Sequence, residues 1–440
     1  MPNLSDLKKS LGIEQPGREL HALIERLYPI CRSITGDGVR ETLAILSEGV
    51  QMTVHEVPSG TKVLDWTVPK EWNIRDAYVK DASGRRVIDF QASNLHVVGY
   101  SVPVEAKMTL AQLSPRLHSL PNRPSWIPYR NSFYTEDWGF CLSDDDLRAL
   151  PDDEYEVRID STLADGSLTY GEVVIPGKET EEVLVICHVC HPSLCNDNLS
   201  GNAVSSFLCR ALAETDPRYT YRFLFLPVTI GGITWLALNE HRVSNVRAGL
   251  VLTLLGDAGP VTYKKSRRSD TIIDRAALHV LKHAAPGHQI QEFSPYGYDE
   301  RQFCSPGFNL PVGCLMRTPH GCFPEYHTSG DNLDFVKAEC LEDSLEKCLA
   351  ILEIVDRDET YVSLNPKGEP QLGRRGIFRA LQDREDDGAN EMALLWVLNF
   401  SDGEHSLLDI AERADLPFAK ICAAADVLWD NGLLKSSRAG

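Results

Sequence analysis

Four apolar runs between residues 183 and 318 constrain the fold of this chain more than any other feature. They read VLVIC, YRFLFLP, AGLVLTLLG and PVGCLMRT, and stretches of helical pattern such as NAVSSFLCRALAET and TIIDRAALHVLKHA separate them. Strands that are apolar on both faces and alternate with helices are typical of a largely parallel sheet covered on both sides. The sequence therefore predicts an α/β fold with a mostly parallel central sheet.

Further segments flank this body. Residues 20–46 have the pattern of two amphipathic helices, and residues 337–355 have that of a closing helix. Between residues 54 and 170 the chain changes to short alternating runs, among them VIDF, LHVVGYSV and AKMTL, broken by Pro and Gly. We predict an α/β domain built from residues 1–53 and 171–365, with a β-rich domain inserted at 54–170.

The end of the chain has the pattern of a winged helix-turn-helix, which we assign to residues 375–440. The stretch ALLWVLNF is followed by the helical HSLLDIAERA and LPFAKICAAADVLWD, and then by LLKSSR. The second helix of this pair carries Lys420 as its sole basic residue, beside Asp426 and Asp430. DNA readers need the opposite charge. Nucleic acid is therefore not an expected partner, and the domain is predicted to serve packing or homo-oligomerisation.

The charge balance restricts the partners further. The 440 residues carry a formal net charge of -19, which repels phosphate backbones and anionic lipid. No apolar run approaches the ~20 residues that span a bilayer, and the opening MPNLSDLKKS lacks the apolar segment of a signal peptide. We expect a cytoplasmic protein without a membrane partner, whose twelve cysteines are reduced rather than paired.

The segment VLVICHVCHPSLCNDNLSG carries the strongest functional signal. Its apolar strand ends at His188, and Asp197 follows a loop and leads into a helix. Ligands of open α/β sheets gather at the carboxyl ends of strands, and an imidazole with a carboxylate suits Zn²⁺. The alternative is structural: Asp197 caps the helix and His188 satisfies a hydrogen bond in the core.

Later segments place more polar side chains near the ends of predicted strands. Asp257 follows the strand in LVLTLLGDAG, and His327 lies in EYHTSGDNL, between a strand and the closing helix. Asp299 and Glu300, in YGYDERQF, precede the segment that runs into the last strand. A carboxylate there can act as a general base or bind a substrate amine. Together these positions favour a metal site over separate structural roles.

This order of residues resembles that of the zinc aminopeptidases, which include bacterial leucyl aminopeptidases and glutaminyl cyclases. The matching positions are His188, Asp197-Asn198-x-Ser200-Gly201, Asp257, Asp299 and His327-Thr328. A closer resemblance, over nearly the whole chain, is to bacterial aminopeptidase-like proteins with an inserted β domain and a C-terminal winged helix. Its motifs are SITGDGVRETL, VPSGTKVLDWTVPKEWNIRDAY, HVCHPS, DERQFCSPGFNLPVG and EYHTSGDNLDF.

The resemblance implies a three-layer αβα domain and a zinc site. Carried over by position, it implies that His188 and His327 bind zinc and that Asp197 is a ligand able to bridge two metals. Asp257 is a further candidate ligand on the same grounds. The resemblance also implies aminopeptidase-like activity on a small substrate.

Two positions depart from the pattern of that family. Its aminopeptidases have an Asp two residues after the first His, where this chain has Cys190, and a weaker second shell reduces metal affinity. They also carry a Glu pair after the strand that ends in FLPVTIGG, where this chain has Val228. A valine cannot take a proton or hold a second zinc. We therefore expect one zinc per chain, with Glu300 and Glu325 the nearest replacements for the missing base.

Three functions remain open. The first is a zinc-dependent hydrolase that cleaves an amide or peptide bond in a small amino-bearing molecule or short peptide. The second is a binding or scaffold protein that keeps the fold but has reduced catalysis, which Val228 favours. The third is a ligand-sensing transcriptional regulator, which the C-terminal pattern favours and its charge opposes.

Substrate recognition has two candidate features. The segment PNRPSWIPYRNSFYTEDWGFCL either lines a pocket above the metal or forms the core of the small domain. The residues concerned are Trp126, Tyr129, Arg130, Tyr134 and Trp138. Arg317, at the end of the last strand, either anchors a substrate carboxylate or forms a structural salt bridge.

Overall fold

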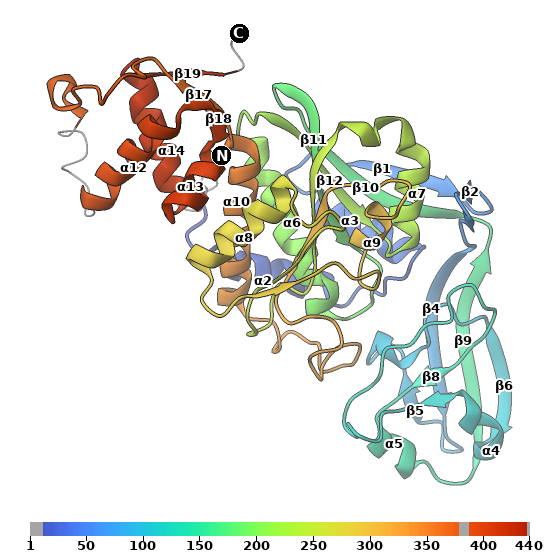
Figure 1. The fold of residues 1–440 in the computed structure, drawn as a ribbon. Coiled ribbons are helices and arrows are strands. Elements are labelled where there is room, and N and C mark those ends of the chain that lie inside the picture. Colours follow the sequence, from blue (N-terminus) through green and yellow to red (C-terminus); the bar gives the residue numbers. More distant parts are fainter. Residues whose placement is uncertain (1–11, 378–386, 438–440) are drawn as a thin grey trace.

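The computed structural model describes residues 12–377 and 387–437, and an eight-stranded mixed sheet forms its centre (Figure 1). The strand order is β1-β10-β12-β11-β13-β16-β14-β15. These strands are β1 (Thr53–Pro58), β10 (Ser167–Ile175), β11 (Glu179–His188), β12 (Tyr219–Leu226), β13 (Val246–Leu252), β14 (Thr262–Lys264), β15 (Gln289–Gln291) and β16 (Val312–Met316). The central strands β12, β11, β13 and β16 run parallel, whereas β10 and β14 pair antiparallel with β12 and β16. The predicted α/β fold is confirmed.

Helices cover both faces of this sheet because both faces of its central strands are apolar. Along β11, Val183 and Val185 belong to one core, and Leu184 and Ile186 belong to the other. Among the described residues of the α/β body, five helices pack on the first core: α2 (Pro16–Leu27), α3 (Asp37–Leu46), α6 (Gly201–Ala213), α8 (Ile272–Ala284) and α10 (Ala338–Arg357). Two helices pack on the second: α7 (Ile230–Asn239) and α9 (Glu300–Phe303). Because both of its faces are buried, β11 has a fixed position in the sheet, and so does His188 at its end.

The two helices predicted near the start of the chain are α2 and α3. Pro16 lies in the first turn of α2, where its missing N–H costs nothing. Leu20, Ile24 and Leu27 then follow at helical spacing and are buried on one face. The predicted closing helix is α10, whose buried side packs against α2 and α8.

A second, antiparallel sheet lies between β1 and β10 in the sequence and projects from one end of the α/β body (Figure 1). Its order is β5-β4-β9-β6, with β4 (Glu71–Lys80), β5 (Arg86–Asp89), β6 (Val104–Thr109) and β9 (Glu154–Ala164). Tyr155, Val157 and Ile159 of β9 are buried in alternation with exposed charged residues, which is the pattern of a sheet with one covered face. The shorter elements of this region are β2 (Lys62–Val63), β3 (Trp66–Thr67), α4 (Leu110–Leu113), β7 (Leu117–His118), β8 (Phe140–Cys141) and α5 (Asp144–Ala149).

The C-terminal helices lie at the opposite end of the body (Figure 1). They are α12 (Asp387–Phe400), α13 (Leu407–Ala414) and α14 (Phe418–Asp430), beside a sheet of β17 (Thr360–Ser363), β18 (Asp402–Ser406) and β19 (Leu434–Ser436). β17 precedes residue 375, so the paired wing starts before the predicted boundary. Leu408, Ile421 and Leu428 join the first core of the body. Arg275 of α8 pairs with Asp409 and Glu412 of α13, at 2.7 Å each.

Each of the twelve cysteines is a free thiol, and ten of them are buried. None of the helices in the described part of the chain combines the length and the apolar character that a bilayer crossing requires.

Candidate metal centre

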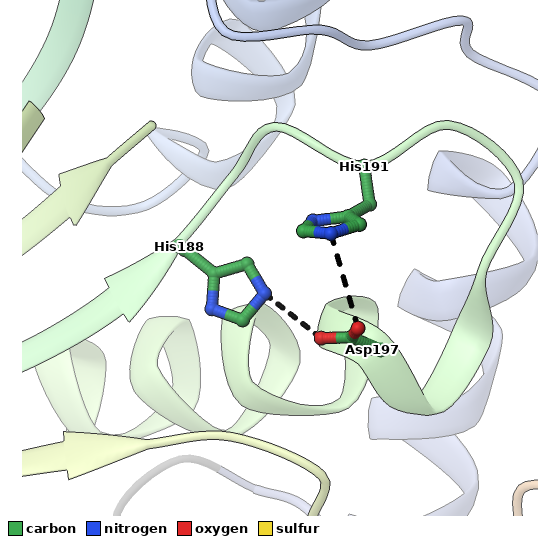
Figure 2. Close-up of side chains that lie close together, drawn as sticks. All are labelled: His188, His191 and Asp197. Carbon is green, nitrogen blue, oxygen red and sulfur yellow. Dashed lines mark hydrogen bonds and ion pairs between the residues drawn. The ribbon is translucent and has the colours of Figure 1, made fainter. Parts of the chain in front are cut away.

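Three histidines converge on the carboxylate of Asp197 at the carboxyl end of β11. His188 is the last residue of β11, and its Nε2 lies 2.9 Å from Asp197 Oδ1. His327 Nε2 lies 3.0 Å from Asp197 Oδ2, and His191 Nε2 lies 3.9 Å from the same oxygen. Figure 2 shows the rings of His188 and His191 both directed at Asp197. The structure therefore brings His188, Asp197 and His327 together.

His191 is a member of this cluster that the sequence analysis did not single out. It follows His188 by three residues, in HVCHPS, and ligand atoms of His188, His191 and Asp197 all lie within 4.8 Å of one another. Burial and the neighbouring histidines lower the pKa of His191 to about 3, so its imidazole is neutral at ordinary pH. The feature of the sequence that could have identified His191 as a candidate ligand is its position as a second histidine in the loop after the strand.

Asp197 is held in place by the loop that carries His327. It is fully buried in the turn η3 (Cys195–Ser200). Asp331 accepts hydrogen bonds from the backbone N–H groups of Asn196 and Asp197, at 2.6 and 3.0 Å. Burial alone would raise the pKa of Asp197, but its interactions with His191, His188 and His327 outweigh burial and hold this pKa well below its usual range. Asp197 is thus a buried anion with both oxygens directed at imidazoles.

Asn198 determines which ring nitrogen of His188 carries the proton. Its Nδ2 donates to the carbonyl of Leu252 at 3.0 Å, and its Oδ1 accepts from two backbone N–H groups, so the amide orientation is set. The same Nδ2 lies 3.3 Å from His188 Nδ1, which is therefore an acceptor. His188 carries its proton on Nε2 and donates to Asp197. A cation bound at Nε2 would require the other neutral tautomer, in which the proton of His188 lies on Nδ1.

Aromatic rings enclose the histidines. Tyr298 stacks on His188 with ring centroids 5.1 Å apart, and Tyr326 stacks on His327 at 4.0 Å. Tyr129 meets His327 edge-on at 5.1 Å and His191 at 5.2 Å. Burial raises the pKa of all three phenols, which stay neutral. Apolar ring faces around polar nitrogens exclude water and strengthen the electrostatic interactions at Asp197.

A pocket of about 320 Å³ opens beside His327. Its lining residues are Leu120, Asn122, Arg123, Pro128, Tyr129, Arg130, Tyr326, His327 and Thr328. The inserted region reaches this place because residues 123–130 pair with residues 324–329. The Tyr129 N–H donates to the His327 carbonyl at 2.8 Å, and the Ser329 N–H donates to the Ile127 carbonyl at 2.8 Å. A larger cleft of about 860 Å³, between the N-terminal helices and the inserted sheet, has none of the clustered histidines in its wall.

The structure does not bring Asp257 to the histidines. Its Oδ1 accepts from the Thr318 hydroxyl at 2.5 Å and from the Gly259 N–H at 2.8 Å. Its Oδ2 accepts from the Asn196 side chain at 3.0 Å and from the Thr318 N–H at 3.2 Å. With four donors already bound, this carboxylate connects neighbouring loops and supports Asp197 through Asn196.

The predicted carboxylates Asp299 and Glu300 are both buried. Glu300 forms an ion pair with Lys264, whose side chain is also buried, at 2.8 Å. Neither oxygen of Asp299 has a hydrogen-bond partner among the residues that the structure describes. Burial, together with the charge of Glu300, raises the pKa of Asp299 to about 8. Asp299 therefore holds a proton over most of the physiological range.

Glu325 is partly exposed and lies two residues before His327. In the described part of the chain its carboxylate makes no hydrogen bond or ion pair, in contrast to the paired Glu300. The two departures from the family pattern contact each other: the Val228 N–H donates to Cys190 Sγ at 3.2 Å. Cys190 Sγ lies 3.6 Å from His191 Nδ1, so it adjoins the second histidine of the loop.

Of the two alternatives for Arg317, the salt bridge is the one observed, with Asp343 at 2.8 Å. The residues of the aromatic segment 121–142 differ in role: some line a pocket and others belong to the core of the inserted region. Tyr129 and Arg130 line the pocket beside His327, whereas Trp138 packs on the core of the inserted sheet. Tyr134 borders a separate pocket near Tyr100.

The donor set of the cluster suits zinc. Three imidazole nitrogens and a carboxylate are ligands that Zn²⁺ prefers. Their nitrogen to oxygen spacings of 2.9, 3.0 and 3.9 Å bracket the roughly 3.3 Å edge of a tetrahedron with ~2.0 Å metal bonds. The buried, ionised Asp197 supplies the negative charge that a cation requires.

Comparison with known families divides the chain into two parts. The family described as "Domain of unknown function (DUF4910)" matches residues 21–358, and a winged helix-turn-helix family matches residues 359–436. A curated protein of Clostridium acetobutylicum is 51% identical over 421 residues, which are 96% of this chain and 97% of that protein. It is named as a candidate polysaccharide biosynthesis protein with an aminopeptidase-like domain.

Solved structures give the same picture. The crystal structure of a candidate peptidase from Clostridium acetobutylicum is 50% identical, covers 96% of both chains and has a TM-score of 0.91. A zinc aminopeptidase from Bacillus subtilis is 13% identical, covers 77% of this chain and 94% of its own, and has a TM-score of 0.58. An M28 peptidase precursor from Shewanella amazonensis, also 13% identical, covers 77% and 94% with a TM-score of 0.53. The last two likenesses concern the fold alone.

Proposed function

The chain belongs to the DUF4910 family, with a winged helix-turn-helix domain behind it, and we propose that it is a zinc-dependent amide hydrolase of the aminopeptidase type. The resemblance to the zinc aminopeptidases is confirmed for the fold. Because one fold hosts many chemistries, the fold by itself does not carry the proposal.

The observation that carries it is the convergence of three imidazoles on one buried carboxylate. His188, His191, Asp197 and His327 would hold the metal. A histidine with a purely structural role in a packed core needs only one hydrogen-bond partner. That need does not explain why three imidazole rings surround a single carboxylate. Cations explain such a cluster better, since they neutralise the buried charge of Asp197.

A bound zinc would polarise the substrate carbonyl and lower the pKa of water at the site. The residues of the chain supply the remaining parts. The rings of Tyr129, Tyr298 and Tyr326 exclude bulk water from the histidines. The pocket beside His327 holds the substrate against them. Asp331 keeps Asp197 in position through its two backbone hydrogen bonds.

We assign the role of general base to Glu325. Of the three candidate carboxylates, Glu300 is occupied by Lys264, and Asp299 is buried and protonated. Glu325 is partly exposed and unpaired, and it adjoins Tyr326 and His327, which line the pocket. It can therefore accept a proton and exchange it with solvent, which a general base must do in each turnover.

The test is hydrolysis by full-length protein that has been stripped of metal and reloaded with zinc. The panel comprises aminoacyl amides, dipeptides and N-acyl amino sugars, the last because the Clostridium relative is named for polysaccharide biosynthesis. Glu325→Gln is expected to lower kcat by roughly 10²–10⁴-fold. Glu346→Gln, at an exposed site on α10, is the matched control and is expected to behave as wild type.

One observation favours a second candidate, a binding or scaffold protein with reduced catalysis. Val228 occupies the position of the family's catalytic Glu, and its backbone is tied to Cys190. Protein that binds zinc but hydrolyses no member of the panel, with Val228→Glu raising activity from background, would support this candidate over the first.

A further inference from the structure

The pocket beside His327 is positively charged in a negatively charged protein. Arg123 and Arg130 are among its lining residues, which include no acidic residue, although the whole chain has a formal charge of -19. Neither arginine has an ion-pair partner among residues 12–377 and 387–437. Two guanidinium groups without a carboxylate partner repel each other, and among the described residues the one hydrogen bond recorded for their N–H donors is that of Arg123 to the Pro324 carbonyl.

Hydrogen bonds hold the backbone around both arginines near the loop of His327. Arg123 donates to the carbonyl of Pro324 and lies over the ring of Trp126, 5.5 Å from its centroid. The carbonyl of Arg130 accepts from the Gly99 N–H at 2.9 Å. Between them, the Tyr129 N–H donates to the His327 carbonyl at 2.8 Å. A group bound by the arginines would therefore lie close to His327, because the backbone that carries them is already in place.

We propose that this pocket binds the anionic group of the substrate, a carboxylate or a phosphate, through Arg123 and Arg130. The inference rests on the proposed hydrolase function and narrows it: the substrate is a small amide that carries a negative charge. Guanidinium groups bind planar carboxylates and phosphates in bidentate fashion. A volume of about 320 Å³ suits a small metabolite rather than a long peptide.

The pocket has a second property that fits this role. Asn122 and Tyr129 also line the pocket, and the ring of Tyr129 meets that of His327 edge-on. The amide of the substrate would thus face the histidines while its charge stays at the arginines. The charge of the site would set this orientation of the substrate. His327, at the other end of the pocket, contacts the anionic carboxylate of Asp197, which would repel the anionic group of the substrate.

The experiment measures anion binding by metal-free, full-length protein, with glutarate and inorganic phosphate as separate probes in calorimetry. Arg123→Met and Arg130→Met keep much of the side-chain length and remove the charge. Each is expected to weaken binding by about tenfold or more, the worth of a charge-assisted hydrogen bond. Arg158→Met is the matched control, since Arg158 is an exposed arginine on β9 of the same inserted region. Circular dichroism confirms that each variant is folded.

The outcomes are distinct. Binding of glutarate alone identifies a carboxylate, binding of phosphate alone identifies a phosphate, and either result supports the proposal if the two pocket variants lose it and the control keeps it. Absence of binding for both probes, or equal weakening in all three variants, overturns it. Because neither metal nor turnover enters the measurement, a failure of the proposed hydrolase activity would leave this result readable by itself.

Discussion

The carboxylate of Asp197 is contacted by histidine side chains from distant parts of the sequence. His188 ends β11, His191 lies in the loop that follows it, and His327 comes from the loop before α10, 130 positions away from Asp197. The short spacing of the first three residues is visible in the sequence. The contact with His327 depends on Asp331, which pins the start of η3 to the second loop. The cluster is thus a property of two loops held together by backbone hydrogen bonds.

His327→Ala is expected to remove most of the zinc affinity while the protein stays folded. The side chain of His327 is about one third exposed, so its loss opens no cavity in the core, whereas its Nε2 faces Asp197. Loss of one ligand or its partner typically costs 10-fold or more in affinity. Competition with a chelator measures the affinity, and the unfolding midpoint checks the fold.

His241→Ala serves as the control for this variant, because His241 is an exposed histidine that does not belong to the cluster. A His327→Ala protein that retains zinc, or one that fails to fold, would assign His327 a structural role instead.

Asp299 makes the stability of the metal-free protein fall with rising pH. Its folded pKa is about 8, whereas an unfolded aspartate ionises near ~3.9. Between these values the folded state binds more protons than the unfolded state, so the free energy of unfolding decreases by up to ~1.4 kcal/mol per pH unit. Asp299→Asn removes this dependence and is expected to raise the urea midpoint more at about pH 8 than at about pH 5.

Asp216→Asn controls for the loss of an aspartate, since the Asp216 side chain is 82% exposed. Equal pH slopes for Asp299→Asn and wild type would show that Asp299 is ionised in the folded protein.

At the scale of elements, periodicity predicts helices and strands well but not their partners. The double-sided apolar pattern of β11 and the spacing of α2 each match the structure because local burial decides them. The fate of a polar residue depends on what packs beside it. The sequence predicts Asp257 as a metal ligand, but in the structure its carboxylate accepts a hydrogen bond from Thr318. The sequence also predicts Glu300 as a base, but in the structure its carboxylate is paired with Lys264. These partners lie 61 and 36 positions away, beyond the reach of any local pattern.

The helix α14 is expected not to bind DNA. Its exposed residues are Ala419, Asp426, Trp429 and Asp430, which include two acids and no base. Asp426 is also engaged by Arg357 of α10 at 2.7 Å. A gel-shift assay with random duplex DNA at low salt is expected to show no complex. A complex that dissociates steeply as salt rises would reveal phosphate contacts and overturn this prediction.

At the scale of the whole molecule, three parts contribute unequally to the candidate site. The α/β body supplies the histidines and Asp197, the inserted region supplies the arginine wall of the pocket, and the C-terminal helices lie at the opposite end of the body (Figure 1). The body could be predicted from the sequence together with three of the clustered residues. The pairing of residues 123–130 with 324–329 could not, because irregular segments without apolar periodicity give no register.

The stoichiometry of zinc is expected to be close to one per chain. The donor atoms surround a single carboxylate, Asp257 already accepts four hydrogen bonds, and Val228 offers no ligand atom. Elemental analysis of dialysed full-length protein gives the ratio directly. Two tightly held ions per chain would mean that a carboxylate outside the cluster, Asp299 or Glu325, rearranges to bind the second.

The pairing of the inserted region with the His327 loop also sets an order of events during synthesis. Ile127 and Ser329 are hydrogen-bonded at 2.9 Å although they are 202 positions apart. The inserted sheet can fold on the ribosome as soon as its strands emerge, but its loop at residues 123–130 has no partner until residue 329 has been made. Closing so long a loop costs entropy that local contacts do not offset. The pocket is therefore among the last parts of the molecule to form, and a nascent chain released early would be folded in its sheets yet unable to hold a ligand.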